Sequence, residues 1–332
     1  MAERKQRPET RKATLRDVAA AAGVSIWTAS NTYSNPAKVA EGTRQRVLDA
    51  AAELGYLGPH PAARSLARDR AGVIAFVAPG DPEALLGDPA AALVAHGLLT
   101  ACSRAGFSVL LSGDSAGQMV DGRVFFRDVA ISDRAVPTVV IDGDPGPGID
   151  AVRADVQGAA RAVTAHLRDL GHQRLAVLAW RGADARLAGV AEGWDPALPP
   201  PEVFALDGSA ARPTPAAGEA LARAALARSP RPTALIALSD TLATSALAAA
   251  HWMRLDVPGD VSIAGVDDLP GSAAAGLTSA LVAYRPLGER AGDLLAARLG
   301  DQDLAAFPDL PTALSIRRST GPPRPDERPQ DT

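Results

Sequence analysis

The feature that most constrains this chain is a pair of short helical patterns near its start, separated by a glycine and a valine. Thr14 followed by Asp17 resembles a capping box, and apolar residues then recur at helical spacing. Gly23 ends this first helix where a left-handed residue is favoured, and Ser25 caps the next helix at once. Two helices joined by so short a turn form a helix-turn-helix, a motif that places the start of its second helix in a DNA major groove.

The spacing of residues along the second helix predicts which side chains face the DNA. Ala29 and Tyr33 are four residues apart and can face the first helix, which leaves an adjacent stripe at the helix N-terminus facing outward. Trp27 lies in this stripe, and we interpret it as exposed because DNA covers it; the alternative is that Trp27 packs on a neighbouring domain. The residues of this region expected to contact DNA are Thr14, Ser25, Ile26, Trp27, Thr28, Ser30 and Asn31.

A third helix is expected from Glu41 to Leu54. Its Arg44 and Arg46 are available for DNA phosphates, which position a protein on the duplex without reading its sequence. The apolar spacing predicts a buried face made of Val47, Leu48, Ala51 and Leu54.

A short hinge helix is expected within residues 59–70, where Pro61 can occupy the first turn. Such a helix is too short to be stable alone in water, so we expect it to fold only on DNA in a dimer. Ala63 and Leu66 are its expected DNA contacts, and Leu66 is suited to wedge between base steps in the minor groove.

The charge distribution agrees with a head that meets a polyanion. Residues 1–70 carry 12 Lys and Arg against 7 Asp and Glu, a net charge of +5, whereas the remainder carries 22 against 31, a net charge of −9. A solvated basic tail would give the same count, and residues 1–12 are expected to form a disordered basic tail.

The remaining composition excludes other classes of protein. The single cysteine, Cys102, allows no intrachain disulfide and is expected to be a small buried hydrophobe, which fits a reducing cytoplasm. No apolar run reaches the ~18 residues of a membrane span, and the charged N-terminus lacks the apolar core of a signal peptide. The five histidines show no metal-ligand spacing, and GxSxG and P-loop motifs are absent, so we expect no metal, no cofactor and no enzyme activity.

The rest of the chain alternates short apolar runs with helical patterns such as 156–170 and 241–253. This alternation predicts parallel sheets with helices on both faces. The strand-like runs are Val73–Val77, Val109–Leu111, Val139–Ile141, Leu175–Leu178, Ala234–Ala237 and Ile263–Val266.

A set of motifs, taken in order, resembles the LacI/GalR family of bacterial transcriptional regulators. The head carries TLRDVAAAAGVSIWTASNTYSN, TRQRVLDAAAELGY and PAARSLA. The body carries HLRDLGHQRLAVL, ARLAGV, LSDTLATSALAAA, VPGDVSIAGVDDLP and LPTALSIRRST. The resemblance covers residues 13–320.

The resemblance implies a fold class and a domain plan. The fold would be an N-terminal all-α helix-turn-helix DNA-binding head followed by an α/β body like a periplasmic binding protein, with two doubly wound parallel-sheet subdomains around a cleft. The implied ranges are 13–58 for the head, 59–70 for the hinge helix, 71–152 and 284–310 for the N-subdomain, 153–283 and 311–320 for the C-subdomain, and 321–332 for a disordered tail.

The resemblance also implies a sugar-like effector in the cleft, where ligands of such folds meet the carboxyl ends of the strands. The residues that fall there by motif are Asp142, Arg186, Ser239, Asp240 and Asp267. Carboxylates and an arginine suit a polyhydroxylated ligand because they pair with hydroxyl groups. Two alternatives remain: Asp240 as the N-cap of the helix that follows it, and Arg186 as half of a surface ion pair.

Departures from the family pattern bear on this expectation. The family usually has a full helix where residues 111–122 leave no room for one, and the segment between Trp194 and Phe204 is also short. An aromatic residue that often follows the first strand is missing, although Trp180 could partly replace it. Asn31 stands where arginine is frequent, and asparagine pairs with adenine whereas arginine pairs with guanine.

The leading hypothesis is therefore a cytoplasmic, nucleoid-associated homodimeric repressor that binds a pseudo-palindromic operator of double-stranded DNA and responds to a small-molecule effector. The alternative, which the missing helix and the aromatic-poor cleft motivate, is a DNA-binding regulator that has lost its small molecule. Its body would then serve only for dimerisation or for a protein partner.

Overall fold

The computed structural model describes residues 13–56, 58, 70–77, 87–112, 119–127, 131, 135–206, 214–300, 302 and 308–324. The chain divides into two compact units, Met1–Gly72 and Val73–Thr332. The expected basic tail 1–12 lies outside the described residues, as do Ala63 and Leu66 of the expected hinge helix.

The first unit consists of short helices whose ends follow local sequence signals. Its elements are α1 (Leu15–Ala21), α2 (Ile26–Ser34), the 3₁₀ turn η1 (Pro36–Lys38) and α3 (Glu41–Glu53). The predicted capping box is confirmed, since Thr14 and Asp17 satisfy each other's backbone N–H groups. Gly23 has φ +64°, and Ser25 caps α2, so the predicted turn is also confirmed.

The core of the first unit differs from the predicted one on α3. Leu48 and Leu54 were expected to be buried, but they are 39% and 42% exposed. Leu48 follows the buried Val47 by one residue and so points about 100° away around the helix, and Leu54 lies at the helix C-cap. The side chains that fill this small core are Val18, Ala19, Ala29, Val47, Ala50 and Ala51.

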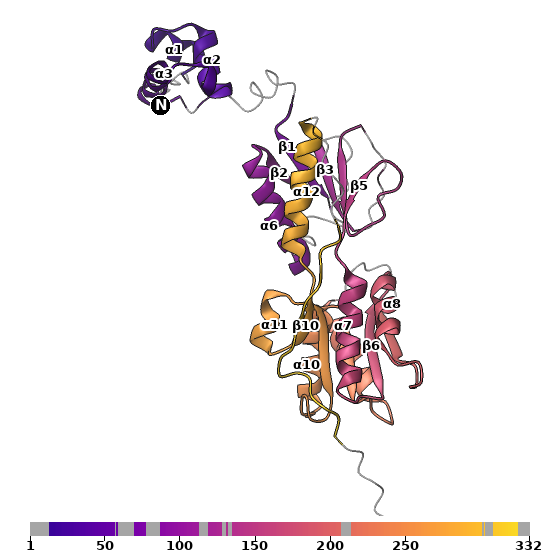
Figure 1. Ribbon diagram of the computed structural model, residues 1–332. Coiled ribbons are helices and arrows are strands. Elements are labelled where there is room, and N and C mark those ends of the chain that lie inside the picture. The colour runs from indigo at the N-terminus through magenta and orange to yellow at the C-terminus, as the bar shows by residue number, and fades with distance from the viewer. Residues whose placement is uncertain are drawn as a thin grey trace, which may run out of the picture. The chain divides into compact units, whose positions relative to one another are not determined.

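The second unit contains two lobes, each built on its own sheet (Figure 1). The sheet of the first lobe, here called the N-lobe, is parallel and has the strand order β2-β1-β3-β4-β5. Its strands are β1 (Val73–Val77), β2 (Ser108–Ser112), β3 (Gly122–Phe126), β4 (Thr138–Ile141) and β5 (Asp150–Val152). Its helices are α6 (Pro89–Arg104) and α12 (Tyr284–Leu299).

The second lobe, here called the C-lobe, has the strand order β11-β10-β9-β8-β6-β7, with β11 antiparallel to its neighbour. Its strands are β6 (Leu175–Trp180), β7 (Glu202–Leu206), β8 (Ala234–Ala237), β9 (Ser262–Asp267), β10 (Thr278–Leu281) and β11 (Leu314–Ser315). Its helices are α7 (Val156–Asp169), α8 (Asp184–Gly193), α9 (Pro215–Leu226), α10 (Asp240–Trp252) and α11 (Pro270–Ala275).

The two lobes cover their sheets differently. In the C-lobe, side chains of α7 and α8 pack on one face of the sheet and those of α9 and α10 on the other. In the N-lobe, α6 and α12 pack together on one face, against Phe76, Phe126 and Ile141. Among the described residues, the opposite face packs against single side chains such as Val120 and Val136, in keeping with the helix that the sequence leaves out.

Three segments connect the lobes. The first passes from β5 to α7, the second from β10 to α12, and the third returns from the N-lobe to β11 (Figure 1). Two of them run side by side, because Ala154 and Leu310 form a parallel bridge. The cavity described below is lined partly by these segments.

Of two smaller expectations, the structure confirms one and corrects the other. Cys102 is fully buried, as predicted, and burial raises the pKa of its thiol to about 12. The start of the expected disordered tail is instead packed on the C-lobe: Gly321 exchanges hydrogen bonds with Ser262, and Arg324 pairs with Asp256. In the described part of the chain, no helix has the length and apolar character needed to cross a membrane.

The close contact of α6 and α12 depends on glycine. A Cβ atom on Gly97 would overlap the carbonyl oxygen of Arg285, and one on Gly288 would overlap that of Val94. We predict that Gly97→Ala lowers the free energy of unfolding by about 1–3 kcal/mol, the usual cost of overpacking. Gly271→Ala on α11 is the matched control, because a Cβ atom there meets open space. Equal urea midpoints for the two variants would contradict this account of the contact.

Candidate DNA-reading and effector sites

The start of α2 is the exposed part of the helix-turn-helix. Trp27 is 69% exposed and Ile26 is 47% exposed, so the outward stripe of the helix carries large apolar side chains. Ser25 caps the helix by accepting a hydrogen bond from the Thr28 backbone N–H at 3.0 Å, and its hydroxyl also contacts that of Thr28. The cap therefore fixes the angle at which Ile26 and Trp27 project.

The remaining predicted DNA contacts are engaged within the unit. The side-chain amide of Asn31 donates to the Trp27 carbonyl oxygen at 3.1 Å, and the backbone of Ser30 accepts from Ser34. Arg44 forms an ion pair with Glu41 at 2.6 Å, both on α3. Thr14 caps α1. Asn31 and Arg44 must therefore exchange these internal partners if they contact DNA.

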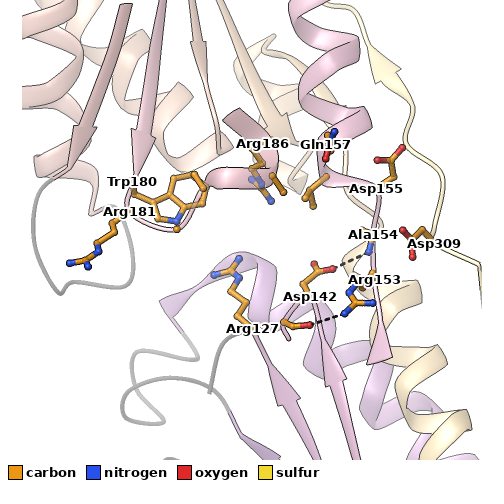
Figure 2. Close-up of a pocket in the computed structure, with 15 residues that line it drawn as sticks. Arg127, Asp142, Arg153, Ala154, Asp155, Gln157, Trp180, Arg181, Arg186 and Asp309 are labelled. Atoms are coloured by element: carbon orange, nitrogen blue, oxygen red, sulfur yellow. Dashed lines mark hydrogen bonds between the residues drawn. The ribbon is translucent and has the colours of Figure 1, made fainter. Parts of the chain in front are cut away.

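A cavity of about 590 Å³ lies between the lobes of the second unit. It opens where parallel strands end: Arg127 follows β3, Asp142 follows β4, and Trp180 is the last residue of β6. Open α/β sheets bind ligands at such carboxyl ends. Figure 2 shows the lining residues. They are Arg127, Asp142, Gly143, Arg153, Ala154, Asp155, Val156, Gln157, Trp180, Arg181, Gly182, Ala183, Ala185, Arg186 and Asp309.

Arg186 belongs to a buried network at the back of this cavity. Its guanidinium lies 3.0 Å from Asp267, donates to the Tyr284 hydroxyl at 3.0 Å and donates to the Leu238 carbonyl oxygen. The Tyr284 hydroxyl in turn donates to Asp267 at 2.7 Å. The alternative of a surface ion pair for Arg186 is therefore wrong, because both charged partners are buried.

Burial and charge act in opposite directions in this network. Burial acts to lower the pKa of Arg186, but the attraction of the neighbouring Asp267 carboxylate outweighs burial, so the pKa of Arg186 is raised and the guanidinium stays charged. Burial and the same carboxylate both raise the pKa of Tyr284, so its hydroxyl stays protonated and remains a donor. Asp267 itself is 5% exposed and does not line the cavity.

Asp142 is the predicted carboxylate that does line the cavity. Its backbone is left-handed, with φ +52°, and one carboxylate oxygen accepts a hydrogen bond from the Ala154 N–H at 2.9 Å (Figure 2). Burial raises its pKa. The carboxylate thus ties the end of β4 to the first connecting segment at the wall of the cavity.

Ser239 and Asp240 lie away from the cavity lining. Ser239 is the N-cap of α10, so the alternative role of Asp240 as that cap is wrong. The Asp240 carboxylate instead accepts hydrogen bonds from the hydroxyls of Ser272 and Ser279 and from the Leu269 N–H. Burial, followed by the nearby Asp267 charge, raises the pKa of Asp240 to about 6.

The structure also identifies cavity residues that the sequence reasoning missed. Arg127, Arg181 and Gln157 were not anticipated, nor were the acids Asp155 and Asp309. The sequence does indicate Arg181 as a cavity residue, because Arg181 directly follows Trp180 at a predicted strand end. The sequence does not indicate Arg127 in this way, because the sequence analysis does not predict β3 as a strand. Across the described residues, no cluster of His, Cys, Asp or Glu could hold a metal ion.

The fold and the sites together define a class: a helix-turn-helix DNA-binding unit followed by a two-lobed body of periplasmic-binding-protein type. Comparison with known families agrees. Residues 14–58 match the family of bacterial regulatory proteins called the lacI family, and residues 164–320 match a periplasmic binding protein-like domain.

Individual proteins extend the match to nearly the whole chain. An HTH-type transcriptional regulator of Mycolicibacterium smegmatis is 30% identical over 360 residues, covering 94% of this chain and 98% of the relative. A Lac repressor dimer bound to operator and the anti-inducer ONPF has a TM-score of 0.77 at 25% identity, covering 94% of this chain and all of that one. A CelR–cellobiose complex has a TM-score of 0.63 at 27% identity, covering 92% and 99%.

This chain therefore belongs to the lacI family of bacterial regulatory proteins. It is a DNA-binding transcriptional regulator and not an enzyme.

The buried ion pair gives a prediction about stability. Arg186→Met leaves the Asp267 carboxylate buried without its guanidinium partner, so we expect the free energy of unfolding to fall by about 3–5 kcal/mol. Adding Asp267→Asn to the same chain should recover part of this loss. The matched control is Arg161→Met, an exposed arginine on α7, which should change stability by less than about 0.5 kcal/mol. Similar unfolding midpoints for Arg186→Met and Arg161→Met would contradict the network.

The raised pKa of Asp240 predicts a pH dependence. Because the folded-state pKa of about 6 exceeds that of an unfolded aspartate, the folded chain binds the proton more tightly. The stabilisation is complete below about pH 4 and is lost as the pH rises through about 6, an effect of about 2–3 kcal/mol. Asp240→Asn should remove this decline, so the readout is the slope of unfolding free energy against pH. Parallel slopes in the two proteins would show that Asp240 ionises normally.

Proposed function

We propose that this regulator is a homodimeric transcriptional repressor whose affinity for a pseudo-palindromic operator changes when a small molecule occupies the cavity between its lobes. The observation that carries the proposal is the cavity itself. It lies at the carboxyl ends of strands and is lined by both lobes, with Arg127 and Asp142 on one side and Trp180 and Arg186 on the other.

A ligand that touches both lobes stabilises one arrangement of them over others. Asp142 and Gln157 offer polar groups for hydroxyls, and Trp180 offers an aromatic face of the kind that stacks on sugar rings. Trp180 is held in place because the Arg186 guanidinium lies 5.5 Å from its ring centroid. The CelR structure with cellobiose supports a sugar-like effector by analogy.

The proposed dimer and the two-fold symmetry of the operator are inferred from the helix-turn-helix unit. One helix-turn-helix reads a short half-site, and two copies related by a two-fold axis read two half-sites. Exposed apolar side chains in both lobes, Leu99 on α6 and Trp252 on α10, are 48% and 72% exposed and suit a contact with a second copy. The Lac repressor dimer on its operator supports the same arrangement by analogy. The protein would act at the nucleoid, in the cytoplasm.

The alternative, a regulator without a small molecule, rests on the N-lobe. Its sheet packs on described helices along one face only, so this lobe has fewer elements with which to close on a ligand. In that case the body would only dimerise or would bind a protein partner.

A thermal-shift screen against sugars, sugar phosphates, nucleosides and amino acids separates the two. A ligand at a hundredfold excess over its Kd stabilises the folded chain by about 2.7 kcal/mol. Trp180→Leu should abolish the shift, whereas Trp27→Leu, which alters an exposed tryptophan of the first unit, should keep it. A hit must also change operator affinity by at least several-fold. If no compound of the panel raises the unfolding temperature while operator DNA still stabilises the protein, the alternative is favoured.

Asn31 gives a prediction about the operator. Selection from random duplexes should return inverted half-sites with adenine opposite Asn31, and Asn31→Arg should convert that preference to guanine, a change of about 1–3 kcal/mol per half-site. Asn35→Arg, at the far end of α2, is the control for added charge and should tighten binding to all sequences without changing the base. An unchanged selected sequence with Asn31→Arg would exclude Asn31 from base reading.

A further inference from the structure

We propose that the effector carries an anionic group, a carboxylate or a phosphate, held at a cationic end of the cavity formed by Arg127, Arg181 and the first turn of α8. This inference rests on the proposed effector function and names the chemistry of the ligand. The charges of the lining residues are not evenly spread. Figure 2 shows Arg127 and Arg181 on the side of Trp180, Arg186 and Asp142 near the middle, and Asp155 and Asp309 on the other side together with Arg153.

The two arginines of this end come from different lobes. Arg127 follows β3 of the N-lobe, and Arg181 follows β6 of the C-lobe. Arg186 differs because its ion pair with Asp267 is buried, with side chains only 9% and 6% exposed, whereas the Arg127 side chain is 32% exposed in its ion pair with Asp88. An anion placed between Arg127 and Arg181 would therefore link the lobes through charge, which is what a ligand that sets their arrangement must do.

Arg127 is held in position before any ligand arrives. One guanidinium nitrogen lies 3.1 Å from Asp88, and the guanidinium stacks 4.5 Å from the centroid of the Phe126 ring. Asp88 is itself engaged as the N-cap of α6, where it accepts from the Ala90 N–H. A planar guanidinium fixed in this way loses little conformational freedom when a carboxylate or phosphate binds it.

The first turn of α8 adds backbone N–H donors to this end, and its acidic side chain, Asp184, is exposed and does not line the cavity. No side chain caps this helix at Ala183, and both Ala183 and Ala185 line the cavity. The residue before the cap, Gly182, has φ +91° and also lines the cavity, so the backbone there comes close to a ligand without side-chain obstruction. Backbone N–H groups at a helix start attract anions through hydrogen bonding and the helix dipole.

The other parts of the cavity fit the rest of such a ligand. Trp180 offers an apolar face next to the cationic end, and Asp142 and Gln157 offer polar groups beyond it. The cavity volume of about 590 Å³ lies within the range of small-molecule sites and accommodates a compound of the size of a sugar acid or a sugar phosphate.

The test compares four probes at constant ionic strength: inorganic phosphate, glucose 6-phosphate, glucuronate and glucose. Binding to the full chain is followed by saturable thermal stabilisation. We expect at least one anionic probe to bind, and Arg181→Met or Arg127→Met to weaken its binding by about tenfold or more, the effect of one charged hydrogen bond. Arg161→Met, which removes an exposed arginine outside the cavity, should leave the affinity unchanged, and Arg181→Lys should restore part of it. Preference for the phosphates or for glucuronate identifies the anionic group.

Three results would overturn the inference. Anions that bind equally well to the wild type and to Arg181→Met and Arg127→Met would be held elsewhere. If glucose binds and changes operator affinity while the anions do not bind, the proposed function stands and the anionic effector is wrong. If no probe binds while operator DNA still stabilises the chain, the cationic end does not hold anions. Conversely, an anion that binds through Arg181 without changing operator affinity supports the site and contradicts effector control.

Discussion

The buried charge of Arg186 is the constraint on which the body of this regulator depends. A guanidinium with almost no solvent contact needs partners for its charge and its donors, and here those partners are Asp267, Tyr284 and the Leu238 carbonyl. They come from the ends of two strands and from the first residue of α12, the helix that enters the N-lobe. One electrostatic requirement therefore fixes the back wall of the cavity and the second connection between the lobes together.

Local signals predicted the local structure well and the long-range structure poorly. Thr14, Gly23 and Ser25 act within three residues of their partners, so the helix-turn-helix was readable from sequence. The strands β3 and β7 were missed although they carry the short apolar runs Val124–Phe126 and Val203–Leu206, because runs of this length do not distinguish a strand from a helix segment. Leu48 was misplaced because an apolar residue beside a buried one need not share its face. The one-sided packing of the N-lobe depends on α12, which begins at Tyr284, 132 residues after the last strand of that lobe ends at Val152.

The candidate site was predicted in part for a similar reason. The rule that ligands meet the carboxyl ends of strands placed Asp142, Arg186, Asp240 and Asp267 at the cleft between the lobes, but it does not say which way each side chain turns. Asp240 turns inward because three hydrogen-bond donors converge on its carboxylate. They are Ser272 on α11, Ser279 on β10 and the backbone N–H of Leu269, which lies between β9 and α11. Those donors lie 29 to 39 residues away, so no local pattern reveals them.

The same network decides what a ligand can gain in the cavity. Asp267 and Arg186 are the groups best suited to a polyol, yet each already has a charged partner, and a neutral ligand would have to compete with that pairing. Arg127 and Arg181 line the cavity outside this network, with the first turn of α8 next to Arg181 and Asp88 holding Arg127 in a partly exposed ion pair. A ligand with an anionic group gains attraction there without breaking the pair behind it. Because these arginines belong to opposite lobes, that attraction acts on the arrangement of the lobes and leaves the buried network intact.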